Sequence, residues 1–275
     1  MTTPSSPSGS LNPAAQMLDR LGRAATGIVS SFGYGASLFF QAVYWLFRGR
    51  QLRQIVRVEH VVAEMMLIGV QAIPIVSVLS LAIGVTLSMQ GIQSLEQFGA
   101  QHQVIFGVAL SVTREFGPLI TGILVAGRSG SSLAARISTM TISQEVDALK
   151  VMGINPVRFL VAPSLVAMLI VLPALTLWSI CIALLGSALF VTQVIGTTLG
   201  AYVAEVNASI TMDDLGHGLI KSAIFAVLIT SVAAAQGSSV EGGAEGVGRV
   251  TTDSVVGGIS AIIITDMLFV FAVTT

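Results

Sequence analysis

Long stretches without a charged side chain are the feature that most limits how this chain can fold. Residues 65–95 contain no Asp, Glu, Lys or Arg, and the 46 residues between Arg158 and Glu205 contain none either. A helix needs about 20 mostly apolar residues to cross the hydrocarbon of a bilayer. Over the whole chain 53% of residues are hydrophobic and 10% are charged, with a mean hydropathy of +0.87. This composition argues against a soluble domain, which needs a larger charged surface.

The gaps between charged residues predict an all-α integral membrane protein with five transmembrane helices. We place the first, second, fourth and fifth spans at residues 65–95, 102–127, 216–236 and 252–275. The third lies within the uncharged residues after Arg158. Lys and Arg gather in residues 20–57 and 128–158, and basic residues are retained on the cytoplasmic side of a membrane. With the N-terminus in the cytoplasm, five spans put the C-terminus outside.

The uncharged stretch after Arg158 fits either two tight spans or one long helix followed by a segment that does not cross the membrane. The loop at residues 205–214 holds three acidic residues and no basic one. Two spans would leave this acidic loop in the cytoplasm, whereas one span leaves it outside, which the positive-inside rule favours. We therefore expect one span, with residues 191–204 forming an extracytoplasmic or re-entrant segment.

The first 60 residues are expected to lie outside the spans. Residues 1–16 are polar and lack the basic and apolar regions of a signal peptide, which predicts a disordered tail. Residues 24–47 are uncharged, but arginines flank them on both sides. Since a sixth span would leave a basic cluster on each side of the membrane, we favour a helix in the headgroup plane. The predicted domains are the tail, an interfacial region at 17–60 and a permease domain at 61–275.

Three charged side chains fall inside the predicted spans, namely Arg114, Glu115 and Asp266. A charge at mid-bilayer is costly unless it faces protein, water or a counter-charge, so all three should point inward. Neighbours on a helix diverge by about 100°, so Arg114 and Glu115 should make separate contacts. Two interpretations stay open. The charges line a cavity, or a salt bridge from Arg114 or Glu115 to Asp266 or Lys221 ties helices together.

The residues after this charged pair predict a kink in the second span. Pro118 has no N–H to donate to the carbonyl of Arg114, four residues earlier, and its ring disfavours a straight helix. Gly117 precedes it. A kink beside charged residues is expected where a helix bends to line a cavity.

Small residues line one face of the first span, at Ser77, Ser80, Gly84 and Ser88. Their spacing of three or four residues predicts close packing against another helix. Gln90 and Gly91 end this span. The Gln90 side chain there either meets a lipid headgroup or caps the helix, and the sequence does not choose between the two.

The connection between the second and third spans contains a second functional signal. Within residues 143–152, Val146, Leu149 and Met152 recur at three-residue spacing while the charged residues lie elsewhere, which predicts a short amphipathic helix. Gly153 supplies a C-terminal stop. An amphipathic helix on the cytoplasmic side between two spans is suited to docking into a groove of another protein.

Several motifs in this region resemble those of one transporter family. DALKVMG, residues 147–153, resembles the Glu-Ala-Ala-x-x-x-Gly coupling loop of ABC importers, with Asp147 for Glu and Leu149 for the second Ala. The longer string REFGPLITGILVAGRSGSSLAARISTMTISQEVDALKVMGINPVRFLVAP, with LSMQG before it and GVGRVTTDSVV after it, is much more specific. It resembles the MlaE/YrbE family, the permease subunits of MCE-associated ABC transporters. The resemblance covers roughly residues 15–275.

That resemblance implies a fold and a set of partners. The fold would be an N-terminal interfacial helix, five spans and a cytoplasmic coupling helix at about 138–153. The partners would be a separate ATP-binding subunit, a second permease copy or paralogue, an MCE-protein hexamer and a lipid ligand, in a bacterial inner membrane. This chain would bind no cofactor, because the partner subunit uses the ATP. Nucleic acid is not expected as a partner, since the basic clusters flank membrane spans.

The resemblance also implies roles for individual residues. Those assigned to a lipid cavity are Leu87, Gln90, Arg114, Glu115, Lys221 and Asp266. Those assigned to contact with the ATPase are Glu145, Asp147, Ala148, Leu149 and Gly153. Gly117 and Pro118 are assigned to the helix kink. Residues 192–212 match the family poorly, which leaves the contacts with the MCE partner open.

The leading interpretation is a permease subunit without chemistry of its own, moving phospholipid-like lipids, since an apolar wall with few charges fits an amphipathic molecule. An intramembrane enzyme is disfavoured because His60, His102 and His217 form no Ser-His-Asp or HExxH arrangement. The single cysteine, Cys181, provides no cysteine metal site. The alternative is an ion-coupled carrier or channel that uses the three intramembrane charges as a relay. That alternative leaves the amphipathic docking helix unexplained.

Overall fold

The computed structural model describes residues 58–274 and, before them, residues 33, 35, 37–42 and 44. All regular structure within these residues is helical, and they contain no strand. The predicted tail and most of the predicted interfacial region lie outside the described residues, so both stay predictions. Of the part that is described, Leu38 and Ala42 are buried against a cluster that includes Leu133 and Leu160.

Five stretches of helix among the described residues are long and apolar enough to cross a membrane, which confirms the predicted number. They are Val58–Glu96, Gln101–Ile142, Val157–Ile195, Met212–Ser238 and Gly243–Val273. The second extends beyond its predicted end at Gly127, through α6 (Ser131–Ile142), and the fifth begins at Gly243 instead of residue 252. The reason is that a charge gap marks the hydrocarbon layer, whereas a helix can continue past it into the headgroups and water.

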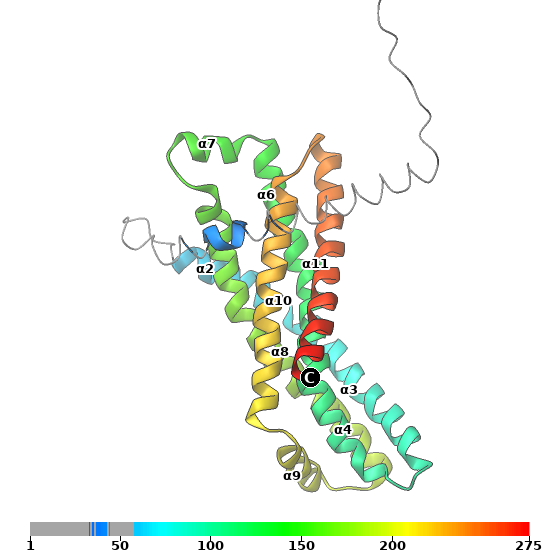
Figure 1. The fold of residues 1–275 in the computed structure, drawn as a ribbon. Helices are drawn as coiled ribbons and strands as arrows, with labels where there is room; N and C mark the ends of the chain where they lie inside the picture. The colour runs from blue at the N-terminus through cyan, green and yellow to red at the C-terminus, as the bar shows by residue number, and fades with distance from the viewer. Residues whose placement is uncertain (1–32, 34, 36, 43, 45–57, 275) are drawn as a thin grey trace, which may run out of the picture.

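The uncharged stretch after Arg158 forms one long helix, as the positive-inside argument predicted. α8 (Ala162–Ile195) ends at Gly196, whose φ of 74° is the left-handed C-terminal conformation that glycine favours. A separate short helix, α9 (Leu199–Ser209), follows. α9 lies at the end of the molecule opposite to α7 (Glu145–Val151), the helix between the second and third spans (Figure 1). The segment predicted not to span, residues 191–204, is thus shifted in the structure, because residues 191–195 still belong to α8 and the separate helix α9 continues to Ser209.

The small-residue face of the first span packs against α8. α3 (Ile73–Glu96) approaches so closely at Gly84 that an added Cβ would lie 1.9 Å from the carbonyl oxygen of Ala183. Two serine pairs flank this crossing, with 2.7 Å between the hydroxyls of Ser80 and Ser179 and 2.6 Å between those of Ser88 and Ser187. Both pairs join residues 99 positions apart, so the two helices run parallel. The predicted close packing is confirmed.

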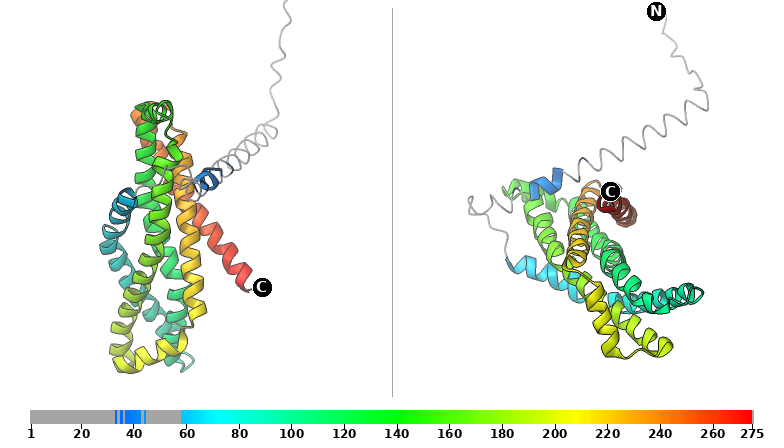
Figure 2. Two further views of the ribbon diagram at one scale, coloured as in Figure 1. Left: turned by 90° about the vertical axis from the view of Figure 1, so that its left-hand side faces the viewer. Right: turned by 60° about the horizontal axis from the view of Figure 1, so that its bottom comes forward.

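α10 (Met212–Ser238) is the most enclosed of the spanning helices. Its most apolar window is 56% buried, against 22% in the first span and 17% in the fifth, which is formed by α11 (Gly243–Thr274). Phe225 and Ile229 of α10 pack in a core with residues of the second and third spans. The first and fifth spans thus keep large uncovered faces, and the left view of Figure 2 shows the two spans on either side of α10.

Candidate functional site

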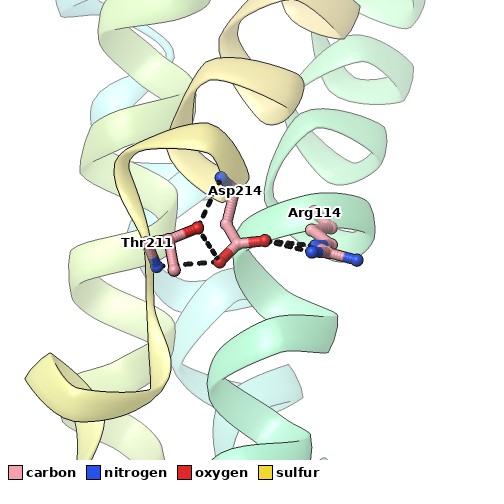
Figure 3. Close-up of polar contacts among 3 residues, drawn as sticks. All are labelled: Arg114, Thr211 and Asp214. Atoms are coloured by element: carbon pink, nitrogen blue, oxygen red, sulfur yellow. Dashed lines mark hydrogen bonds and ion pairs between the residues drawn. The ribbon is translucent and has the colours of Figure 1, made fainter. Parts of the chain in front are cut away.

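An ion pair between Arg114 and Asp214 joins the second and fourth spans (Figure 3). Arg114 lies in η3 (Val112–Phe116), a π-helical turn between α4 (Val104–Ser111) and α5 (Gly117–Val125). Its Nε and Nη2 atoms both donate to Oδ1 of Asp214. The Asp214 side chain is 2% exposed, whereas that of Arg114 is 47% exposed. The carboxylate is therefore enclosed by the protein, and the guanidinium keeps one open side.

Asp214 is positioned by Thr211, the residue that caps the N-terminus of α10. The Thr211 hydroxyl oxygen accepts from the backbone N–H of Asp214 at 3.3 Å. In return, Oδ2 of Asp214 accepts from the backbone N–H of Thr211 at 2.8 Å and from its hydroxyl at 2.7 Å. This reciprocal pattern is a capping box. One carboxylate oxygen thus fixes the start of the helix, which leaves the other aimed at Arg114 (Figure 3).

A second charge cluster joins Glu115, Lys221 and Asp266, from three different spans. The Lys221 ammonium nitrogen lies 2.5 Å from Oε2 of Glu115 and 3.0 Å from Oδ1 of Asp266. It also lies 5.2 Å from the ring centroid of Phe269. The Lys221 side chain is 2% exposed, so a buried cation is compensated by two carboxylates and an aromatic face, as buried charges require.

Arg114 and Glu115 therefore face different partners, as their adjacent positions on one helix predicted. The salt bridge from Glu115 to Lys221 is among those that the sequence suggested. The partner of Arg114 differs from the suggestion, because it is Asp214 and neither Asp266 nor Lys221. Asp214 and Thr211 escaped prediction because they lie in a loop that the charge pattern placed outside the membrane. The sequence Thr-x-x-Asp before an apolar run is the signal that could have identified this cap.

The Gly117–Pro118 step lies directly after the π-helical turn that carries both charges. A π-helical turn is a local interruption of the regular helix, and such turns are common at functional sites. A Cβ added at Gly117 would lie 2.6 Å from Cγ1 of Ile180 in α8. Glycine therefore lets the irregular turn pack directly against the third span.

Leu87 and Gln90 line a groove between α3 and α4. Its volume is about 280 Å³, and it is also lined by Gly91, Ser94 and Ser111. The six residues predicted for a lipid cavity are thus split between two places, because this groove ends at Ser111 and does not include the four charged ones. The Arg114 turn begins one residue after Ser111, so the groove and the charge clusters are consecutive along the second span.

α7 occupies most of the segment predicted to be amphipathic. Val146 packs against the buried cluster under the helix and Leu149 is buried, while Glu145, Asp147 and Ala148 are exposed. Gly153 has a φ of 75° and stops the helix as predicted. Met152 departs from the predicted apolar stripe, because it follows the last helical residue and is 64% exposed.

Sequence comparison places this architecture among known proteins. A family described as Permease MlaE matches residues 61–272. The chain belongs to this family. A probable ABC transporter permease protein of Rickettsia typhi is 33% identical over 214 residues, which are 76% of this chain and 83% of that protein. The intermembrane phospholipid transport system permease protein MlaE of Haemophilus influenzae is 34% identical over 71% of this chain and 75% of its own length.

A plant protein is also similar to this MlaE-family permease. TRIGALACTOSYLDIACYLGLYCEROL 1, a chloroplastic protein of Arabidopsis thaliana, is 31% identical over 73% of this chain and 57% of its own length. The family membership makes this chain a multi-pass ABC transporter permease whose ATPase is a separate subunit. The matched residues 61–272 contain both charge clusters, the groove and α7.

Proposed function

We propose that this permease moves phospholipid-like lipids between a bacterial inner membrane and an MCE-protein partner, driven by ATP hydrolysis in a separate subunit. The observation that carries the proposal is the half-exposed Arg114 of the second span, fixed by a buried carboxylate and placed one turn beyond an open groove. A charge in a membrane span must meet protein, water or a polar ligand. A lipid offers a phosphate for the guanidinium and acyl chains for the groove.

The lipid cavity in this proposal combines two sets of residues. Leu87 and Gln90 would contact the lipid along the groove, and Arg114 and Glu115 would face its headgroup, since both keep exposed area. Lys221 and Asp266 would act indirectly, because they are enclosed and hold Glu115 in position. The name of the Haemophilus influenzae relative, which refers to phospholipid transport, supports this choice of cargo.

Coupling to ATP hydrolysis is assigned to α7. α7 lies at the end of the molecule opposite to α9 (Figure 1), and its residues Glu145, Asp147 and Ala148 are exposed. Val146 packs against the core and Leu149 is buried, so both anchor the helix, and Gly153 fixes the direction of the chain after it. A rigidly anchored helix can transmit movement of an ATPase to the spans. This assignment puts α7 and the N-terminus in the cytoplasm.

A second permease subunit would complete the cavity. The first and fifth spans are only 22% and 17% buried in their most apolar windows. The uncovered faces of these two spans are available for a second permease subunit related by a twofold axis. That subunit would also cover the open side of Arg114. An MCE-protein hexamer would then sit at the end that carries α9.

Reconstitution tests this proposal. The permease, its ATPase and its MCE partner are assembled in liposomes, and ATP-dependent transfer of a fluorescent phospholipid is measured with Arg114→Ala against wild type. We expect transfer to fall at least about tenfold, which is the effect of losing one charge-assisted contact of about 1.5 kcal/mol. Arg249→Ala, which changes an exposed arginine of α11 outside the groove and both charge clusters, is the matched control. Equal transfer by Arg114→Ala and wild type would contradict the lipid assignment.

The alternative of an ion-coupled carrier is favoured by one observation. Lys221 lies between Glu115 and Asp266, so three ionisable groups adjoin one another across three spans. A chain of this kind can relay protons. Ion flux through this chain alone in liposomes, abolished by Asp266→Asn, would support the alternative, whereas ATP-dependent lipid transfer without ion flux would exclude it.

A further inference from the structure

Two adjoining chambers lie beside Arg128, away from the charge clusters and the groove. A small chamber of about 80 Å³, the polar chamber, has polar lining residues that include Glu64, Gln71, Ser132, Arg136 and Ser164, beside apolar ones such as Leu67 and Met168. A larger chamber of about 290 Å³ is lined by apolar residues that include Ala72, Ile75, Ile123, Leu124 and Ile259. Arg128 and Ser129 line both. The two chambers thus form one site with a polar end and an apolar end.

The polar chamber carries a surplus of positive charge. Arg136 donates to Glu64 and, at 3.1 Å, to the hydroxyl of Ser164. Arg128 donates to the neutral side chain of Gln71, and among the described residues no carboxylate forms a salt bridge with it. Two guanidinium groups therefore face one carboxylate. The Nε atom of Arg136 is buried and has no hydrogen-bond partner among the described residues.

Arg128 lies at a position where a lipid headgroup can reach it. Arg128 is exposed and lies in η4 (Ala126–Gly130), directly before α6, which leads to α7. An arginine at the boundary between hydrocarbon and water attracts anionic headgroups. A guanidinium also matches the geometry of phosphate oxygens, to which it donates two parallel hydrogen bonds.

We propose that this pair of chambers binds one anionic phospholipid. Its phosphate contacts Arg128 and the exposed part of the Arg136 guanidinium, whose side chain is 39% exposed, and one acyl chain enters the chamber lined by Ile75, Ile123 and Leu124. The site shares no residue with the groove at Leu87 or with either charge cluster. It is therefore a second lipid site, and it does not depend on whether the first one carries cargo.

Native mass spectrometry of the full-length chain in detergent tests the headgroup contact. Binding of dioleoyl phosphatidylglycerol is compared with that of dioleoyl phosphatidylcholine, in wild type and in Arg128→Gln. We expect wild type to bind phosphatidylglycerol about fivefold more tightly, the contribution of one basic residue near a membrane surface, and Arg128→Gln to lose this preference. Arg249→Gln removes the same charge from an exposed position in α11 outside both chambers and serves as the control. An equal loss in Arg249→Gln would overturn the proposal.

A second variant tests the acyl-chain chamber. Ile75 is 48% exposed, so Ile75→Trp can fill the chamber without disturbing the core. We expect it to weaken binding of both lipids at least about fivefold, whereas Val78→Trp, at a more exposed position of the same helix, leaves binding unchanged. If inorganic phosphate displaces phosphatidylglycerol and Ile75→Trp has no effect, the site binds small anions only and the proposal is wrong. A loss of dimer mass in Ile75→Trp with unchanged lipid binding would overturn it too, because the chamber would then be an interface between two copies.

Discussion

At the scale of single residues, Lys221 joins three spans of this permease. Its ammonium group contacts carboxylates of the second and fifth spans from a position in the fourth, and its side chain is 2% exposed. Removing one partner of a buried ion pair leaves uncompensated charge, which costs more than the pair itself contributes. The stability of the protein and the geometry of the charge cluster therefore both depend on the ammonium nitrogen of Lys221.

We predict that Lys221→Met lowers the free energy of unfolding by about 3–5 kcal/mol, because Glu115 and Asp266 lose their counter-charge. The measurement is thermal unfolding of the purified chain in detergent. Lys150→Met is the control, since the Lys150–Asp147 pair is exposed on both sides and such pairs contribute about 0–1 kcal/mol. A Lys221→Met protein as stable as the Lys150→Met protein would show that the cluster is well solvated.

The sequence predicted the charged residues of the site but not all of their partners. The charges at Arg114, Glu115 and Asp266 stood out because they interrupt apolar runs. The partner of Arg114 did not, because it is 100 residues away in the chain and adjoins a loop. Only the packing of α10 against η3 brings Asp214 to Arg114, and no local pattern encodes that crossing.

At the scale of elements, the pairing of α3 with α8 depends on small residues that let the two backbones approach closely. The α3–α8 crossing has Gly84 against Ala183 on one side and Gly186 against Leu81 on the other, with backbone atoms in near contact. Without a hydrophobic drive between helices in lipid, such close approach and the hydroxyl pairs beside it provide the attraction. The spacing of the small residues predicted this face correctly, although it could not identify α8 as the partner.

We predict that Gly84→Ala destabilises the protein by roughly 1–3 kcal/mol, the usual cost of overpacking. The new Cβ would lie 1.9 Å from the carbonyl oxygen of Ala183, so the helices must separate. Gly107→Ala is the matched control, because a Cβ there meets no atom within 4 Å. Unfolding temperatures of the two variants in the same detergent provide the measurement, and equal values would refute the argument.

α7 gives a prediction about coupling. Glu145→Lys reverses an exposed charge in the first turn of this helix, and a like-charge contact across an interface costs several kcal/mol. We expect lipid transfer to fall at least about tenfold while ATP hydrolysis by the assembled complex continues. Glu241→Lys, an exposed charge reversal in the connection between α10 and α11, is the control. Normal transfer in Glu145→Lys would remove the assignment of α7 as the coupling helix.

At the scale of the whole molecule, the odd number of spans determines which surfaces meet which compartment. The sequence predicted that number because charge gaps follow the thickness of the bilayer, and this physical link is strong. It predicted the ends of the helices less well, because α6 and the start of α11 continue beyond the apolar windows. The prediction of one span after Arg158 places α7 and α9 at opposite ends of the molecule, because that single span separates them.

Single-cysteine labelling checks this arrangement. In a Cys181→Ala background, which removes the exposed native thiol, Ala148→Cys in α7 and Val203→Cys in α9 are compared in inverted and right-side-out vesicles. Both positions are exposed, so access depends on the compartment. We expect a membrane-impermeant maleimide to label α7 only in inverted vesicles and α9 only in right-side-out ones. Labelling of both positions from one side would contradict an odd number of membrane crossings between α7 and α9.

The parallel pairing of α3 and α8 has a consequence for biosynthesis. Each serine hydroxyl pair joins residues 99 positions apart, and a ribosome adds about 5–20 residues per second. The first span therefore waits roughly 5–20 s after its own synthesis before the helix that covers its glycine and serines exists. Until then the nascent chain exposes this face to lipid or to the insertion machinery, which leaves it open to premature pairing.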